Sequence, residues 1–162
     1  MVSYWIFLVK DHVHMGRIIP AKEVLIDRVK NKFWSLNSRS RNVKKIKPGD
    51  LVIFYVTSRD EKGFMGRGVV STEPHPITPE QRFHVLGIPS EAFDYAVDFS
   101  EAEIWDKSIP LEKLMNKISI LSGRRSQRAP FRGSVIRVSE KDYQTIIELK
   151  TLKNNVKSDL AL

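Results

Sequence analysis

The sequence predicts an α+β fold, a small and mostly antiparallel β-barrel with two to four helices on its rim. Short runs of β-branched and aromatic residues recur along the chain, and several of them follow hairpin-like turns. Helical spacing or helix-start signals interrupt these runs at two or three places. The 162 residues suffice for one ordinary domain. We therefore expect a single domain over residues 1–150 and a flexible C-terminal tail over residues 151–162, where little pattern remains.

The first half of the chain contains two predicted strands on either side of one helix. Residues 3–9 are aromatic and β-branched, which is typical of a buried strand. Pro20 suits the first turn of a helix, and residues 21–32 carry a short apolar stripe at helical spacing. The turn signal Lys-Pro-Gly-Asp at residues 47–50 introduces an almost wholly apolar strand over residues 51–56.

The middle of the chain predicts a hairpin, a short helix and a long alternating segment. Residues 64–71 return from a polar turn at residues 59–63, and two glycines in this strand indicate a bulge or a sharp bend. Thr78 predicts the N-cap of a short helix that begins at Pro79. Residues 93–104 alternate between apolar and polar side chains, as a half-buried strand or a pair of strands does.

The last third predicts one more strand between two helical segments. Residues 110–115 predict at least one helical turn, and residues 133–138 predict the final strand. Ser139, with Asp142 three residues later, resembles the capping box that starts a helix, which we expect to continue to about residue 150.

Positive charge gathers in two blocks on either side of an acidic middle. Residues 28–49 hold eight Lys or Arg and no acidic residue, and residues 116–162 hold ten basic and four acidic residues. Residues 50–115 hold six basic and twelve acidic residues. Such segregation is typical of a surface that binds a polyanion, so we expect RNA or DNA as the partner. The alternative is a pair of solvated basic surfaces without a partner.

The sequence lacks the common motifs of catalysis and metal binding. It has no Gly-rich phosphate loop, no His-Glu-x-x-His and no nucleophile elbow. Without cysteine, disulfides and thiol catalysis are excluded, and few ligands remain for a structural zinc. His12 and His14 are a weak metal signal, and we expect two loop histidines near solvent instead. We therefore expect a cytoplasmic binding protein that is not an enzyme, uses no cofactor or metal and has no membrane partner.

Residues 33–42 carry the most specific functional signal. Trp34 stands at the predicted end of the first helix and is followed at once by small polar and basic residues. An indole can stack on a base, Ser35 and Asn37 can pair with base edges, and Arg39 and Arg41 can hold phosphate. A Trp between Phe and Leu is more often a core residue, and this alternative stays open.

Four segments, in this order and spacing, resemble an EVE domain, which belongs to the PUA-like superfamily together with the YTH and ASCH domains. They are the opening strand, Trp34 with the later Lys-Pro-Gly-Asp turn and its strand, a returning strand that ends in Ser-Thr-Glu-Pro, and the start of the last helix. The resemblance covers about residues 3–149. It implies a PUA-like barrel that recognises a nucleobase, often a methylated one, in a pocket at the barrel rim.

The resemblance also implies which residues form the base pocket. The Trp-Ser pair at residues 34–35 resembles that of YTH domains, where the Trp walls an aromatic cage. Lys10, Asp11 and His12 fall where YTH domains place further lining residues, and Asp11 is a candidate for an edge hydrogen bond. YTH domains supply a second cage Trp late in the chain, where this sequence has none. Either Phe131 or Leu121 takes its place, or the cage is incomplete.

Basic residues from both blocks are the predicted contacts to the nucleic-acid backbone. They are Arg39, Arg41, Lys44, Lys45, Arg124, Arg125, Arg128 and Arg132. The late arginines are alternatively a mobile basic loop. Two other functions stay open, namely a small ASCH-like amidohydrolase of modified nucleosides that recruits Lys22 and Glu23, and a basic module that contacts an acidic protein. The oligomeric state and the choice between DNA and RNA are not predicted.

Overall fold

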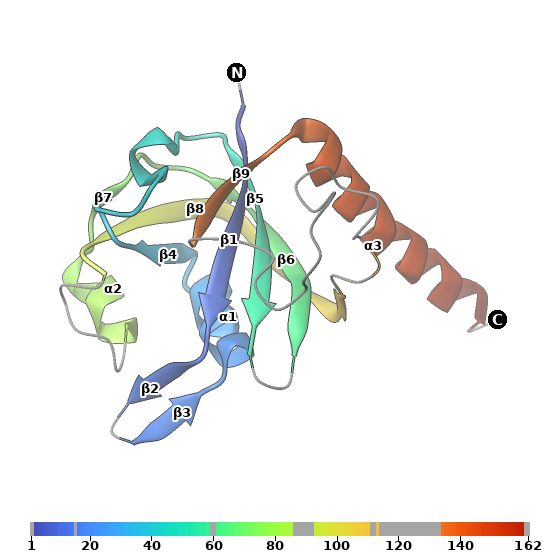
Figure 1. The fold of residues 1–162 in the computed structure, drawn as a ribbon, viewed down its shortest axis with the longest axis horizontal. Coiled ribbons are helices and arrows are strands. Elements are labelled where there is room, and N and C mark those ends of the chain that lie inside the picture. Colours follow the sequence, from blue (N-terminus) through green and yellow to red (C-terminus); the bar gives the residue numbers. More distant parts are fainter. Residues whose placement is uncertain are drawn as a thin grey trace.

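The computed structural model describes residues 2–14, 16–58, 61–85, 93–110, 113 and 134–160, with only the backbone at residues 14 and 152–160. Its main feature is a curled sheet of seven strands (Figure 1). The strands are β1 (Tyr4–Lys10), β4 (Phe33–Leu36), β5 (Leu51–Thr57), β6 (Lys62–Val70), β7 (His75–Pro76), β8 (Tyr95–Ile109) and β9 (Val135–Val138).

The sheet has the strand order β4-β8-β6-β5-β1-β9, with β7 also paired to β8. Strands β1 and β5 run parallel, and the other strand pairs of the described residues run antiparallel. The predicted α+β class is confirmed, in the form of a curled half-barrel with β4 and β9 at its two ends.

Three helices and a small hairpin surround this sheet. The helices are α1 (Ala21–Lys30), α2 (Pro79–His84) and α3 (Glu140–Leu160), with a short 3₁₀ turn η1 (Val43–Lys45). The hairpin consists of β2 (His12–His14) and β3 (Arg17–Ile19) and extends from the end of β1 (Figure 1). Among the described residues, no helix is both long enough and apolar enough to cross a membrane.

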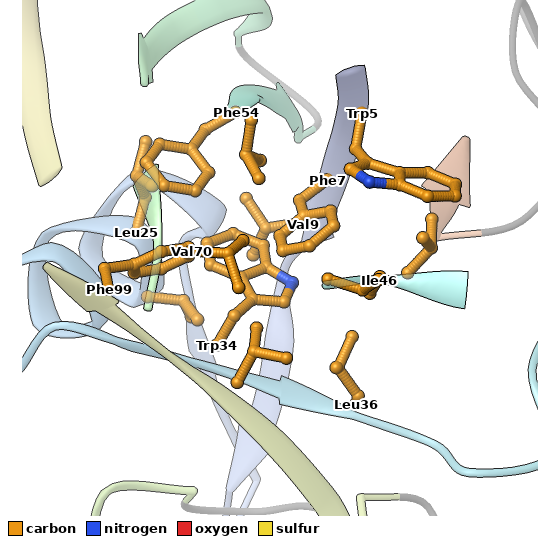
Figure 2. Packing of buried hydrophobic residues seen from close by; sticks show 14 of the residues in the cluster. Trp5, Phe7, Val9, Leu25, Trp34, Leu36, Ile46, Phe54, Val70 and Phe99 are labelled. Carbon is orange, nitrogen blue, oxygen red and sulfur yellow. The ribbon is translucent and has the colours of Figure 1, made fainter. Parts of the chain in front are cut away.

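Two large apolar clusters occupy opposite faces of the sheet because neighbouring side chains on a strand point in opposite directions. Trp5 and Phe7 of β1 join the cluster that α1 covers, which includes Trp34 and Phe54 (Figure 2). Ile6, between them in the sequence, joins the other cluster with the buried residues of α3. The sheet is therefore buried on both faces where β1 and β5 run side by side.

Several local predictions are confirmed in detail. Thr78 caps α2 in a capping box with Gln81, and the Oγ of Ser139 accepts a hydrogen bond from the backbone N–H of Asp142. The register between β6 and β8 shifts between Phe64 and Gly66, as the glycines of this strand indicated. A Cβ on Gly66 would lie 2.2 Å from the carbonyl oxygen of Glu103, so only glycine allows the two strands to approach this closely.

Other elements differ from the prediction. Residues 33–36 form strand β4 and not the end of a helix. Helix α1 ends at Lys30, and Lys32 has a positive φ of 52° that changes the chain direction. Strand β4 then pairs with β8. His12 lies in a strand and not in a loop. The segment from residue 95 is one strand of 15 residues.

Near the C-terminus, one prediction is wrong and two are not tested by the described residues. Helix α3 continues to Leu160, beyond the end expected near residue 150, whereas the flexibility of residues 151–162 stays a prediction. The helical turn predicted at residues 110–115 falls largely outside the described residues.

Candidate nucleic-acid interface

A small cavity of about 40 Å³ lies where β1, the β2–β3 hairpin, α1 and β4 meet. It is lined by Leu8, Val9, His12, Val24, Arg28, Trp34, Ser35, Phe93 and Ser134. A cavity needs about 10–15 Å³ of such space to hold one water molecule. This cavity therefore holds a few water molecules at most, and a base enters only if part of the wall moves outward.

Trp34 lies at the inner side of this cavity and belongs mostly to the core. Its side chain is 4% exposed and stacks on Phe54, with ring centroids 4.9 Å apart and an angle of 9° between the planes (Figure 2). Phe7 packs against it at 5.6 Å. One face of the indole is thus already covered by Phe54, so a base would have to use the remaining surface.

Two further aromatic rings of the cavity wall lie near its mouth. His12 and Phe93 are half-buried, with ring centroids 6.2 Å apart and an angle of 31° between the planes. Burial, together with the positive charge of Arg28, lowers the pKa of His12 to about 4, although the nearby carboxylate of Asp11 opposes the shift. His12 is therefore a neutral imidazole near pH 7, able to donate one hydrogen bond and accept another.

The sequence did not identify Phe93 or Arg28 in this wall, whereas the resemblance placed His12 among the lining residues. The sequence pattern places Phe93 in an alternating strand and Arg28 in the first helix and a basic block. The backbone carbonyl of Phe93 accepts a hydrogen bond from Nη2 of Arg82, which holds this residue from the side of α2. No local pattern connects Phe93 and Arg28, because they come from separate segments of the chain.

The other predicted pocket residues lie beside the cavity and do not line it. The carboxylate of Asp11 accepts a hydrogen bond from the N–H of Ala21 at 2.8 Å, which anchors the start of α1. Lys10 is exposed at the end of β1. The side-chain oxygen of Asn37 accepts from the N–H of Arg39 at 2.8 Å and shapes the following turn. Their predicted contacts to a base stay predictions.

A basic groove of about 800 Å³ begins just beyond β4. Its lining residues are Ser38, Arg39, Ser40, Asn42, Val43, Lys44, Lys45, Ile46, Lys47, Glu73, Pro74 and Tyr95. Three of the predicted phosphate contacts, Arg39, Lys44 and Lys45, therefore share one groove. Four cations against one carboxylate make this groove attractive to a polyanion.

A second groove of about 460 Å³ shares lining residues with both the first groove and the cavity. It is lined by Ser40, Arg41, Asn42, Ser134, Val135, Ile136 and Arg137. The two grooves share Ser40 and Asn42, and the second groove shares Ser134 with the cavity. The side-chain amide of Asn42 donates to the carbonyl of Val135 at 3.1 Å, which fixes the basic loop against β9.

A carboxylate ties the same loop to the aromatic wall. Asp94, next to Phe93, accepts hydrogen bonds from the N–H of Ser38 at 2.8 Å and from its hydroxyl at 2.5 Å. Burial alone would raise the pKa of Asp94, but these hydrogen bonds outweigh it and lower the pKa. The start of the groove and the mouth of the cavity are thus held together by an ionised side chain.

Some predicted residues are not part of this arrangement. Lys22 and Glu23, which the hydrolase alternative would use, are exposed on the first turn of α1. No group of three or more potential metal ligands occurs among the residues that the structure describes. The residues that fall outside the described ranges are Leu121, Arg124, Arg125, Arg128, Phe131 and Arg132.

Known proteins share both the sequence pattern and the fold. The family model described as the EVE domain matches residues 3–149. A UPF0310 protein of Pyrococcus abyssi is 23% identical over 155 residues, which cover 91% of this chain and 99% of the relative.

Two solved structures resemble the whole fold. The human THYN1 protein in complex with 5-methylcytosine-containing DNA has a TM-score of 0.60 at 17% identity, with 91% of this chain and 97% of that chain covered. The YTH domain of the Zygosaccharomyces rouxii MRB1 protein, in complex with N6-methyladenosine RNA, has a TM-score of 0.56 at 10% identity, with 93% and 90% covered. At these identities the likeness shows the shared fold.

Proposed function

Because this chain belongs to the EVE-domain family, we propose that it binds nucleic acid and holds one modified base in the cavity between His12, Trp34, Ser35 and Phe93. The observation that carries the proposal is the shared lining of this cavity and the two basic grooves. Two proteins with the same fold are in complex with nucleic acids that carry a methylated base, which supports the same use of the fold here.

In the proposed mechanism, the grooves hold the backbone and the cavity takes the base. Arg39, Arg41, Lys44 and Lys45 neutralise phosphates without reading the sequence. Extruding one base costs a few kcal/mol, least for a base that is mispaired or already single-stranded. Stacking on an aromatic ring returns about 1–3 kcal/mol, and a buried methyl group adds about 0.8 kcal/mol. We therefore expect a modest preference for a methylated base.

The aromatic wall must open for the base to enter. Two rings that sandwich a base stand about 7 Å apart, which is twice the carbon–carbon contact distance. The centroids of His12 and Phe93 are 6.2 Å apart. Phe93 must therefore move outward before a flat ring fits between them, because the two ring planes are also tilted by 31°. Phe93 is half-buried, so this movement uncovers little apolar surface.

The proposal is tested by binding of Phe93→Ala to short oligonucleotides, measured by fluorescence anisotropy. The probes are single- and double-stranded DNA and RNA, each with and without one methylated base. Loss of base stacking predicts about tenfold weaker binding and no remaining preference for methylation. Phe83→Ala is the matched control, because Phe83 is 82% exposed on α2 and does not line the cavity. If Phe93→Ala binds every probe as the wild type does, the cavity is not the base site.

The role of the groove is tested by the salt dependence of binding. In the variant Lys44→Gln/Lys45→Gln, the slope of log K against log salt on duplex DNA should fall by about 0.9 for each phosphate that these lysines neutralise. Lys107→Gln, at an exposed position of β8, should leave the slope unchanged. Salt-sensitive binding that ignores the identity of every base would favour the protein-interaction alternative. Release of product from an acylated nucleoside would favour the hydrolase alternative.

A further inference from the structure

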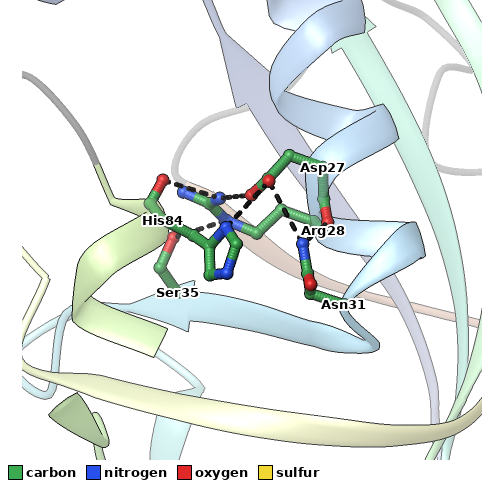
Figure 3. A network of polar contacts seen from close by, with 5 residues as sticks. All are labelled: Asp27, Arg28, Asn31, Ser35 and His84. Carbon is green, nitrogen blue, oxygen red and sulfur yellow. Dashed lines mark hydrogen bonds and ion pairs between the residues drawn. The ribbon is translucent and has the colours of Figure 1, made fainter. Parts of the chain in front are cut away.

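Arg28 lines the cavity and carries a buried donor without a partner in the part of the chain that the structure describes, which a ligand reaches only when the wall opens. Its side chain is 2% exposed, although it belongs to the basic block of the sequence. Nη1 donates to the carboxylate of Asp27 at 2.6 Å and to the carbonyl of His84 at 3.3 Å, and Nε donates to the hydroxyl of Ser35 at 3.4 Å (Figure 3). Nη2 is buried and has no hydrogen-bond partner among the described residues.

A buried N–H group without a partner lowers the stability of the fold unless a ligand accepts a hydrogen bond from it. A guanidinium group carries five N–H donors, has no acceptor and stays charged in proteins. Leaving a buried donor unpaired costs about 1–3 kcal/mol, and more when the group is charged. Burial lowers the pKa of Arg28, while the charge of Asp27 acts against this shift. Packing over the ring of Phe33, at 4.9 Å, fills one face of the guanidinium but satisfies none of its N–H groups.

The neighbours of Arg28 add further donors to the same wall. Ser35 accepts from Nε of Arg28, so its hydroxyl hydrogen is left to donate. His12, neutral near pH 7, supplies one N–H. Both residues line the cavity together with Arg28. A ligand that presents a carbonyl oxygen to the guanidinium satisfies it, whereas a ligand that presents an amino group there opposes it.

We propose that Arg28 determines base specificity by donating from Nη2 to a carbonyl oxygen of the bound base, so that the site selects cytosine, uracil, thymine or guanine over adenine. This inference rests on the proposed function and adds the chemical class of the ligand. Cytosine and guanine each carry one carbonyl oxygen, and uracil and thymine carry two. Adenine has none: its acceptors are ring nitrogens, and its exocyclic group is an amino donor that meets the guanidinium unfavourably. Methylation of carbon or of an amino group leaves the carbonyl oxygens in place.

The wild-type protein provides the first test, with no variant required. Single-stranded oligonucleotides that differ at one central position carry cytosine, uracil, guanine, adenine or an abasic site. We expect each carbonyl-bearing base to bind about tenfold more tightly than adenine. Sulfur is a weak acceptor, so either 2-thiouracil or 4-thiouracil should bind more weakly than uracil and thereby identify the oxygen that is read.

Arg28→Lys and Arg28→Met separate base reading from a purely structural role. Both variants should lose the preference for carbonyl-bearing bases while keeping the salt slope, because Arg28 is too buried to hold phosphate. A structural role alone would weaken binding of all bases equally. Arg67→Met, at an exposed position of β6, controls for the loss of an arginine, and thermal unfolding reports whether each variant folds.

The outcomes distinguish this inference from the proposed function. Equal affinity of the wild type for adenine and for the carbonyl-bearing bases, with weaker binding of the abasic probe, overturns the role of Arg28 and leaves the base site intact. Retention of the full preference by Arg28→Met has the same meaning. Equal binding of abasic and base-containing probes by the wild type overturns both.

Discussion

Replacing Asp50 removes the side chain that ties the Lys-Pro-Gly-Asp turn to the first strand. This side chain is 2% exposed, and its carboxylate accepts three hydrogen bonds. Oδ2 accepts from Nε1 of Trp5 and from the N–H of Lys47, each at 2.9 Å, and Oδ1 accepts from the N–H of Ser3 at 3.0 Å. The same residue thus positions the start of β1, the start of β5 and Lys47 of the basic groove.

The expected loss of stability follows from which of these donors water can reach. A hydrogen bond to a charged group contributes about 1.5–3 kcal/mol. Lys47 is exposed and Ser3 is half-buried, so water replaces part of their loss, but Trp5 is completely buried and its indole N–H would remain unpaired. We expect Asp50→Ala to lower the free energy of unfolding by about 3–5 kcal/mol. Asp50→Asn should cost about 1–3 kcal/mol, because its amide keeps one acceptor oxygen.

Urea denaturation of the wild type and both variants measures these differences. Asp106→Ala, at an exposed position of β8, is the control and should change stability by less than about 0.5 kcal/mol. The free energy of unfolding of an ordinary domain is about 5–15 kcal/mol, so Asp50→Ala should still fold and its stability should be measurable. A cost below about 1 kcal/mol for Asp50→Ala would refute the reasoning, since it would mean that water satisfies all three donors.

The remaining predictions concern His12 and Gly66. In the folded state the pKa of His12 is lowered to about 4, below the ordinary value of 6.5. The stability that depends on the neutral ring is therefore fully present above pH 6.5 and is lost as the pH falls through 4. After allowance for solvent screening of this half-buried ring, we expect the free energy of unfolding to fall by about 1–2 kcal/mol over this pH range. His12→Gln should remove this pH dependence, which urea denaturation at several pH values measures. Gly66→Ala should cost about 3 kcal/mol because its Cβ would meet backbone at 2.2 Å, whereas Gly68→Ala, whose Cβ first meets the ring of Phe54 at 3.1 Å, should cost less in the same assay. Equal costs for the two alanine variants would mean that β8 moves aside.

Elements with strong local signals could be predicted from the sequence, and elements fixed by distant contacts could not. The apolar run of β5 and the cap at Thr78 each depend on neighbouring residues, so local pattern sufficed. Strand β4 has four residues that are all buried, so it shows no alternation, and it pairs with a strand about 60 residues later. Local pattern therefore showed a break in the helix at this segment but did not identify a strand.

The candidate site shows the same division. The resemblance placed Trp34 and Ser35 at the pocket, and both line the cavity. Patterning treats an arginine in a basic block as a surface residue, so it could not foresee that Asp27, Ser35 and His84 together bury Arg28. Phe93 was equally hidden, because its place at the cavity depends on Arg82 and on the bond between Asp94 and Ser38.

Entry of a base into the cavity is tested most directly by an NMR titration of ¹⁵N-labelled protein with two oligonucleotides, one with a base and one abasic at the central position. We predict that the backbone amides of Arg39, Lys44 and Lys45 shift with both oligonucleotides, because the groove holds phosphate in each case. The amides of His12 and Ser35 should shift only with the oligonucleotide that carries the base. If these two amides stay unchanged, or respond equally to the abasic oligonucleotide, the base does not occupy the cavity.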